Sequence, residues 1–211
     1  MPKKLKTRRS TKKFFHLFFN GEVAEPQYFE GFNNLPSNFR IKLHRIAKDK
    51  SEAPWQLIDR AVKVKSDLES KDEFNSKDGD EAWCIFDVDD YLKQSPKKFN
   101  EAIKKAEKNG IKLGWSNQCF EIWFLLHFEY CESVISRKDY DQKLRKYFKK
   151  ECGGFIYQKN CDVFDELSGL QEKAIKNAEK LFKLHPNLQD NPSTKVFEIV
   201  KNLKELLLNN N

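Results

Sequence analysis

Four short apolar segments alternate with longer amphipathic segments over the first 130 residues, and this alternation constrains the fold more than any other feature. The apolar segments are residues 14–19, 39–46, 82–86 and 111–115. The segments between them carry apolar side chains at helical spacing, as at Trp55, Ile58 and Val62. Strands and helices that alternate in this way are typical of βα units. The sequence therefore predicts an α/β fold with about four strands in a mainly parallel sheet flanked by helices.

Beyond about residue 130 the strand pattern fades and helical spacing continues. Helices are expected around residues 140–147, over 163–184 and over 194–208, with a break at residues 153–154, which are both glycine. The turn at residues 191–194 is expected to cap the last helix, and a second role in anchoring the sheet or a substrate stays open. We expect three regions: a basic tail without fixed structure (1–13), the α/β core (14–130) and a helical C-terminal part packed on that core (131–211).

The basic charge is concentrated at one end of the chain. The formal net charge is +7, and residues 1–13 alone hold seven basic residues and no acid, so the remaining 32 basic residues balance 32 acids. The tail could bind phosphates, or it could only keep the chain in solution.

The five cysteines show no C-x-x-C spacing, which argues against a disulfide framework or a structural zinc site. No apolar run is long enough to cross a bilayer, so we expect a soluble, cytoplasmic protein without membrane contact.

The third apolar segment ends in a cluster of carboxylates. Asp87, Asp89 and Asp90 follow it within four residues. If the chain stays extended, Asp87 and Asp89 lie on one face about 6 to 7 Å apart, close enough to share a divalent cation. The alternative is a polar turn in which the aspartates only cap a loop or the next helix.

Further carboxylates follow two of the other predicted strands. Glu22 and Glu25 come after the first strand, and Glu121 comes shortly after Asn117 at the end of the fourth. Because the carboxyl ends of parallel strands lie at one edge of a sheet, these acids should converge with Asp87. The alternatives are ordinary ones, since acids are favoured in a first helical turn and Glu121 could face solvent. His127 is expected to be a satisfied polar residue of its helix, with proton transfer as the other possibility.

Four ordered blocks of sequence resemble the RloB-like family. They are Gly21-Glu22 with Glu25-Pro26 and Tyr28-Phe29, then residues 86–89, then residues 116–128, and finally residues 191–194. The resemblance covers about residues 14–205. It implies a variant of the Toprim fold, which topoisomerases, primases and OLD-type nucleases share. It also implies a place in prokaryotic restriction and abortive-infection loci, often beside an ATPase called RloA.

The resemblance implies phosphodiester cleavage that depends on Mg²⁺ or Mn²⁺, with one or two ions held by Asp87 and Asp89, with Asp90 adjacent. Relatives place a glutamate before the glycine that ends the first strand, whereas this chain has Asn20 there. An amide can coordinate a cation only weakly and cannot act as a base, so Glu22 or Glu25 must take that part, with Glu22 as a further candidate metal ligand. Lys12, Lys13, Arg40, Lys42 and Asn117 are candidate contacts to the nucleic acid.

Three functions fit these residues. The first is a nuclease acting on DNA, tRNA or another RNA as the effector of an anti-phage system, with an RloA-like ATPase as a partner. The second is a catalytically weak interaction subunit with a degenerate metal site. The third, phosphatase or nucleotidyl-transfer chemistry, would use the same carboxylates.

Overall fold

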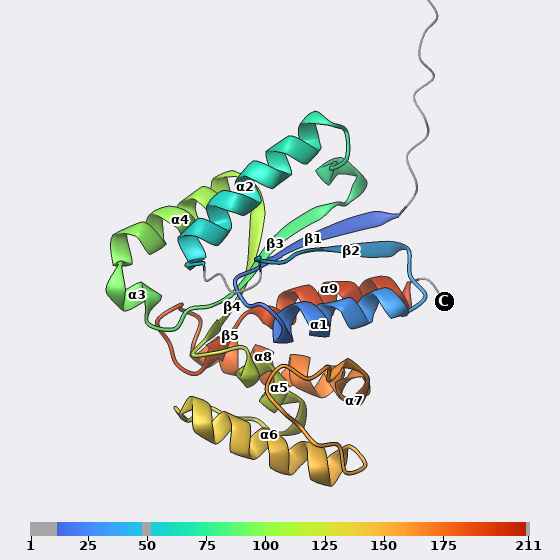
Figure 1. The fold of residues 1–211 in the computed structure, drawn as a ribbon, viewed down its shortest axis with the longest axis vertical. Coiled ribbons are helices and arrows are strands. Elements are labelled where there is room, and N and C mark those ends of the chain that lie inside the picture. The colour runs from blue at the N-terminus through green and yellow to red at the C-terminus, as the bar shows by residue number, and fades with distance from the viewer. Residues whose placement is uncertain (1–11, 48–51, 210–211) are drawn as a thin grey trace, which may run out of the picture.

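A five-stranded sheet forms the centre of the computed structural model, which describes residues 12–47 and 52–209 (Figure 1). The strand order is β2-β1-β3-β4-β5, and the first four strands are parallel. The strands are β1 (Lys13–Phe19), β2 (Phe39–His44), β3 (Glu81–Asp87), β4 (Ile111–Asn117) and β5 (Ser193–Thr194). The predicted mainly parallel α/β fold is confirmed. The fifth strand was not predicted, because two residues are too short to give a strand pattern.

Helices cover both faces of the sheet. In Figure 1, α2 and α4 lie on one face, and α1 and α9 lie on the other, with α5 to α8 stacked beyond them. The helices are α1 (Ala24–Glu30), α2 (Pro54–Ser70), α3 (Tyr91–Gln94), α4 (Pro96–Lys108), α5 (Glu121–Phe128), α6 (Arg137–Glu151), α7 (Phe164–Ser168), α8 (Gln171–Leu184) and α9 (Val196–Leu208), and short 3₁₀ turns occupy Gly31–Asn34 and Ser76–Asp78. None of the helices in the described part of the chain is both long enough and apolar enough to cross a membrane.

Alternate residues of each inner strand enter two separate hydrophobic cores. In β3, Trp83 and Ile85 pack into the core beneath α1, α5 and α9, while Ala82, Cys84 and Phe86 pack into the core beneath α2 and α4. A strand that is covered on both faces needs apolar residues at successive positions. This is why the predicted strands are continuous apolar runs.

The helix predicted over residues 163–184 is two helices, so that prediction is wrong in detail. The α7 helix ends at Ser168, and α8 begins at Gln171. Gly169 lies at the break, and glycine has the lowest helix propensity of any residue except proline. The predicted break at Gly153 and Gly154 is confirmed, since both residues have positive φ.

The turn at residues 191–194 anchors the sheet, whereas its predicted role as the helix cap is wrong in detail, because the N-cap of α9 is Lys195 and no side chain caps it. Thr194 Oγ1 accepts a hydrogen bond from the Val196 amide at 3.2 Å, which supports the start of α9. The same hydroxyl lies 2.9 Å from Ser116 Oγ in the interior, and Ser193 and Thr194 pair with the end of β4. Residues beyond 130 therefore also contribute a strand and a covering helix to the sheet layers.

The predicted tail lies outside the described residues up to residue 11, and Lys13 already belongs to β1.

Candidate metal and active site

Three loops meet at the carboxyl edge of the sheet. They follow β1, β3 and β4, which are neighbours in the strand order. Since these strands are parallel, their ends lie side by side, where α/β proteins generally bind ligands. The loops bring together acids that lie almost 100 residues apart in the sequence.

A cavity of about 270 Å³ lies among these loops. Carboxylates from the three loops line one part of it, and basic and polar residues from the C-terminal part of the chain line another. Its polar lining comprises Glu22, Glu25, Asp87, Glu121, Arg137, Lys159 and Asn160. Of the predicted catalytic acids, four therefore border one cavity, while Asp89 adjoins it through Arg137.

Glu25 is the most deeply buried of these acids. It lies in the first turn of α1 and is 8% exposed. Its carboxylate lies over Gly21, where a Cβ atom would overlap it, so this close approach requires glycine at position 21. Glu22 lies in the same loop and is exposed. Asn20 is not part of the cavity lining, so Glu25 is the acid that the β1 loop buries there.

The buried carboxylates oppose one another electrostatically. Burial raises the pKa of Glu25 to about 7, and the charge of Glu121 adds to this shift. Burial also raises the pKa of Asp87 well above its usual range, with further contributions from Glu25 and Glu121. Asp87 ends β3, and its enclosed Oδ1 has no hydrogen-bond partner in the described part of the chain. An enclosed anionic oxygen without a donor is costly unless a cation or a proton occupies its site.

The extended geometry predicted for Asp87 and Asp89 is wrong. The strand ends at Asp87, and Asp89 lies in a turn with φ of 45°. The two side chains still meet the same group, because Arg137 Nη2 lies 2.8 Å from Asp89 Oδ2 and 3.8 Å from Asp87 Oδ2. Asp90 is directed elsewhere and pairs with Lys93 at 3.3 Å.

Glu121 is the first residue of α5 and borders the cavity, as its position after β4 suggested. His127 lies on the same helix, completely buried, and its Nδ1 donates to the Trp123 carbonyl at 2.9 Å. Burial lowers the pKa of His127 to about 3, and the residue lies outside the cavity lining. The expectation of a satisfied polar residue is met only at Nδ1, because the buried Nε2 of His127 has no hydrogen-bond partner among the described residues.

Asn117 borders a second, smaller cavity of about 120 Å³ together with Asp89 and Asp90. Its Nδ2 donates to the Leu188 carbonyl at 2.9 Å, so this amide anchors the loop before β5.

A larger cavity of about 700 Å³ lies between α4, α9 and the edge of β4. Its acids, Glu107 and Glu198, belong to separate helices and do not form a cluster with the carboxylates of the sheet edge.

The four predicted basic contacts lie away from the acidic cavity. Lys12 precedes β1, Lys13 begins it, and the acids follow the other end of that strand. Arg40 lies near the start of β2 and donates to the Asn33 carbonyl at 2.9 Å. Lys42 lies over the Phe14 ring. The structure therefore does not bring these residues together with Asp87.

Arg137, Lys159 and Asn160 were not anticipated from the sequence. One feature of Arg137 could have pointed to a function. It is the first residue of α6, where the helix dipole disfavours a cation, so helix stability does not explain an arginine at this position. Lys159 and Asn160 lie between helices in a segment without a motif. The basic part of the cavity therefore became visible only in three dimensions.

The donor set suits a hard divalent cation but is not assembled around one. Carboxylate oxygens are the ligands that Mg²⁺ and Mn²⁺ prefer. Within residues 12–47 and 52–209, no group of three His, Cys, Asp or Glu side chains is arranged to hold a metal ion. The partnerless Asp87 Oδ1 and the mutual repulsion of the acids are the features that fit a cation, and Arg137 is the positive group now nearest to Asp87 and Asp89.

Comparison with protein families gives one match, to the family model described as RloB-like protein, over residues 15–203. The chain belongs to the RloB-like family. The matched region runs from β1 into α9 and so includes all three loops of the site. Neither the curated proteins nor the solved structures gave a match. For this RloB-like chain, the function must therefore be argued from the site itself.

Proposed function

We propose that this RloB-like protein is a Mg²⁺- or Mn²⁺-dependent nuclease that hydrolyses phosphodiester bonds in DNA or RNA. One observation carries the proposal: Asp87, Glu25 and Glu121 border one cavity at the carboxyl edge of the sheet, where the enclosed Asp87 Oδ1 has no hydrogen-bond partner among the described residues and the charges of Glu25 and Glu121 raise the pKa of Asp87. Such a cluster is costly in a protein that does not use it. A divalent cation would offset the repulsion at Asp87 and Glu25.

The side chains have distinct parts in this proposal. Asp87 and Asp89 would hold the cation together with Glu25 and Glu121. When bound, the cation would polarise the scissile phosphate and lower the pKa of the attacking water. Glu22, which is exposed at the cavity, would accept the proton of that water. The role in anti-phage defence and an RloA-like ATPase partner are proposed from the family resemblance alone.

Asn20 favours a second candidate function, a catalytically weak interaction subunit of a defence complex. In this case the chain keeps the fold but lacks one acid of the metal site. The burial of Glu25 against Gly21 argues for the first candidate, because it supplies an acid from the same loop. The two candidates predict different outcomes in one assay.

The assay is cleavage of supercoiled plasmid and of tRNA by the purified protein with Mg²⁺ or Mn²⁺. The nuclease proposal predicts cleavage that requires the metal and that falls at least about 100-fold in Asp87→Ala/Asp89→Ala. Asp59→Ala is a matched control, because Asp59 is an exposed acid on α2 that pairs with Lys105. Absence of cleavage by the unmodified protein on either substrate would favour the interaction subunit. Undiminished cleavage by the double variant would exclude this metal site.

A further inference from the structure

The acidic cavity has a basic side that the carboxylates do not explain. Arg137 and Lys159 border it, from the start of α6 and from the segment before α7. No acid within 4 Å of the Lys159 ammonium is found among the described residues, so this cation does not serve an ion pair of the fold. Figure 1 shows α6 farthest from the sheet, beyond α5. A separate structural element thus brings positive charge to the carboxylates.

Arg137 uses only part of its hydrogen-bonding capacity. Its Nη2 donates to Asp89 at 2.8 Å, while its Nε and Nη1 donate to no group in the described ranges. The guanidinium has five N–H donors in a planar fork that matches carboxylate and phosphate oxygens. The remaining donors are therefore available to a second anion in the cavity.

The pair between Arg137 and Asp89 is also easily exchanged. The side chain of Arg137 is 44% exposed and that of Asp89 is 35% exposed. Ion pairs with this exposure contribute little to stability, because water screens both charges. In addition, Arg137 lies at the first residue of α6, where the helix dipole disfavours a cation. Folding stability therefore gives little reason for an arginine at this position.

A divalent cation and Arg137 would compete for the same carboxylates. Asp87 and Asp89 are the acids nearest to the guanidinium and are also the predicted metal ligands. A metal ion bound to them would lie a few ångströms from Arg137, and the two positive charges would repel each other. The arginine would then need a new anionic partner, and a substrate phosphate in the same cavity would supply one.

We propose that Arg137, with Lys159, forms the phosphate-binding side of the cavity, and that Arg137 takes the place of the metal at Asp87 and Asp89 while the site is empty. The inference rests on the proposed function, because it assigns the substrate phosphate to this site. It predicts opposite effects of one substitution on two ligands. Removing Arg137 strengthens metal binding and weakens nucleic-acid binding.

The test uses binding alone, with the full chain and no cleavage. Mn²⁺ affinity is measured by isothermal titration calorimetry. Affinity for labelled 20-nucleotide DNA and RNA strands is measured by fluorescence anisotropy over a series of salt concentrations, with Ca²⁺ in place of Mn²⁺. Arg137→Ala should bind Mn²⁺ about three- to tenfold more tightly. It should bind the better strand about tenfold more weakly, with a salt dependence reduced by about 0.7 in log–log slope.

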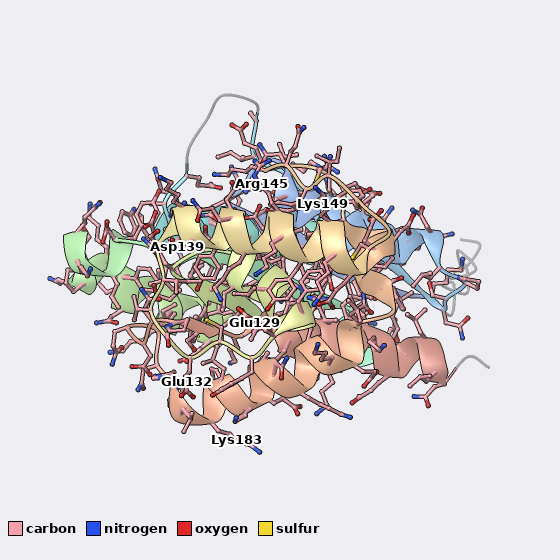
Figure 2. The ribbon with its side chains drawn as sticks, turned by 90° about the horizontal axis from the view of Figure 1, so that it is seen from below. Glu129, Glu132, Asp139, Arg145, Lys149 and Lys183 are labelled. Carbon is pink, nitrogen blue, oxygen red and sulfur yellow. The ribbon has the colours of Figure 1, made fainter. Side chains whose placement is uncertain are left out.

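Arg145→Ala is the matched control. Arg145 lies on the same helix, where Figure 2 shows it, and it pairs with Asp141 at 2.8 Å on the surface. It should leave both affinities unchanged. Arg137→Lys keeps the charge but loses the fork, so its Mn²⁺ affinity should match the unmodified protein while its strand affinity falls. Lys159→Ala should weaken strand binding and should strengthen Mn²⁺ binding less than Arg137→Ala does, because Lys159 forms no ion pair with Asp87 or Asp89 among the described residues.

Unchanged or weaker Mn²⁺ binding in Arg137→Ala would overturn the inference, as would unchanged strand binding. A lowered melting temperature with both affinities unchanged would show that the arginine is only a structural ion-pair partner. An unmodified protein that binds neither strand would also overturn it. A protein that binds Mn²⁺ and a strand in the predicted way but cleaves nothing would retain the inference and contradict the nuclease proposal.

Discussion

The two ends of β3 each carry an aspartate, and the protein surrounds the two side chains in opposite ways. Asp80 precedes the strand and is 4% exposed; its Oδ1 accepts from the Phe14 amide and its Oδ2 from the Asn75 amide, both at 2.9 Å. Asp87 ends the strand with its Oδ1 enclosed and without a hydrogen-bond partner in the described structure. The charges of Glu25, Glu121 and Asp89 act against its ionised form, and Arg137, 3.8 Å from its Oδ2, opposes them only in part.

This difference indicates that Asp80 stabilises the folded state, whereas the charge of Asp87 lowers its stability. Two backbone N–H groups donate to the Asp80 carboxylate, so Asp80 stabilises the loop before β3. Asp87 gains no such donors, and Glu25 and Glu121 make its charge less favourable still. A group that lowers stability at the carboxyl edge of a parallel sheet is a candidate for function.

Substitution of Asp80 should have the largest effect on stability. Asp80→Ala leaves the partly buried amides of Phe14 and Asn75 without their acceptor and should lower the free energy of unfolding by about 2 to 4 kcal/mol. Asp80→Asn keeps one acceptor and should cost less. Urea denaturation followed by circular dichroism measures both. A loss below about 0.5 kcal/mol in Asp80→Ala would show that Asp80 does not stabilise the fold.

The pH dependence of stability should show the effect of Glu25. The pKa of Glu25 rises from its usual 4.5 to about 7 in the folded protein, so the folded state holds a proton that the unfolded state releases between these values. The metal-free protein should therefore lose stability from this group as the pH rises from about 4.5 to about 7, by on the order of 2 to 3 kcal/mol.

Two histidines act in the other direction and need a control. Burial lowers the pKa of His44 to about 4 and that of His127 to about 3, so their contributions favour folding as the pH rises towards 6.5. The difference between the unmodified protein and Glu25→Gln, measured by urea denaturation in EDTA at several pH values, cancels the histidines and reports Glu25 together with its effect on Asp87. Parallel curves for the two proteins would contradict the assigned shift.

Neutralising Asp87 should stabilise the metal-free protein, which is the opposite of the result at Asp80. Asp87→Asn removes a repelled charge while keeping the shape of the side chain, and should raise the free energy of unfolding by about 1 kcal/mol at pH 8. The loss of the weak attraction to Arg137 offsets part of this gain. Destabilisation comparable to that in Asp80→Asn would show that Asp87 is a structural acid.

The smallest effect on stability is expected at Gly21. A Cβ atom at this position overlaps the far end of the Glu25 side chain, which can move aside. Gly21→Ala should therefore change the free energy of unfolding by less than about 1 kcal/mol. It should nevertheless displace the Glu25 carboxylate and weaken Mn²⁺ binding, as calorimetry can show. Unchanged Mn²⁺ affinity would mean that the position of Glu25 over Gly21 is not needed for the site.

The sequence allowed prediction of the parts of this structure that depend on short-range patterns. The four long strands follow from apolar runs, and the convergence of Glu25, Asp87 and Glu121 follows from a parallel sheet. The exact geometry at Asp89 could not be predicted, because the strand ends two residues earlier and the turn places φ in the left-handed region. The distinction between Asp80 and Asp87 was also hidden, since it depends on which backbone amides reach each carboxylate.

Long-range contacts set the other limit. Arg137 meets Asp89 across 48 positions of sequence, from a helix whose packing no local pattern fixes. The β5 strand has two residues, and it is recognisable only once Ser193 and Thr194 lie beside the end of β4. In both cases the decisive partner lies in a distant segment. The basic side of the cavity and the last strand therefore required the structure.

The most direct test of the account is the effect of Mn²⁺ on the melting temperature of the unmodified protein and of Asp87→Asn, measured side by side. A ligand that binds only the folded state stabilises it, by about 2.7 kcal/mol at 100 times its dissociation constant. We predict that Mn²⁺ raises the melting temperature of the unmodified protein by several degrees and that of Asp87→Asn little or not at all. Equal rises in the two proteins would contradict a metal site at the carboxyl edge of the sheet.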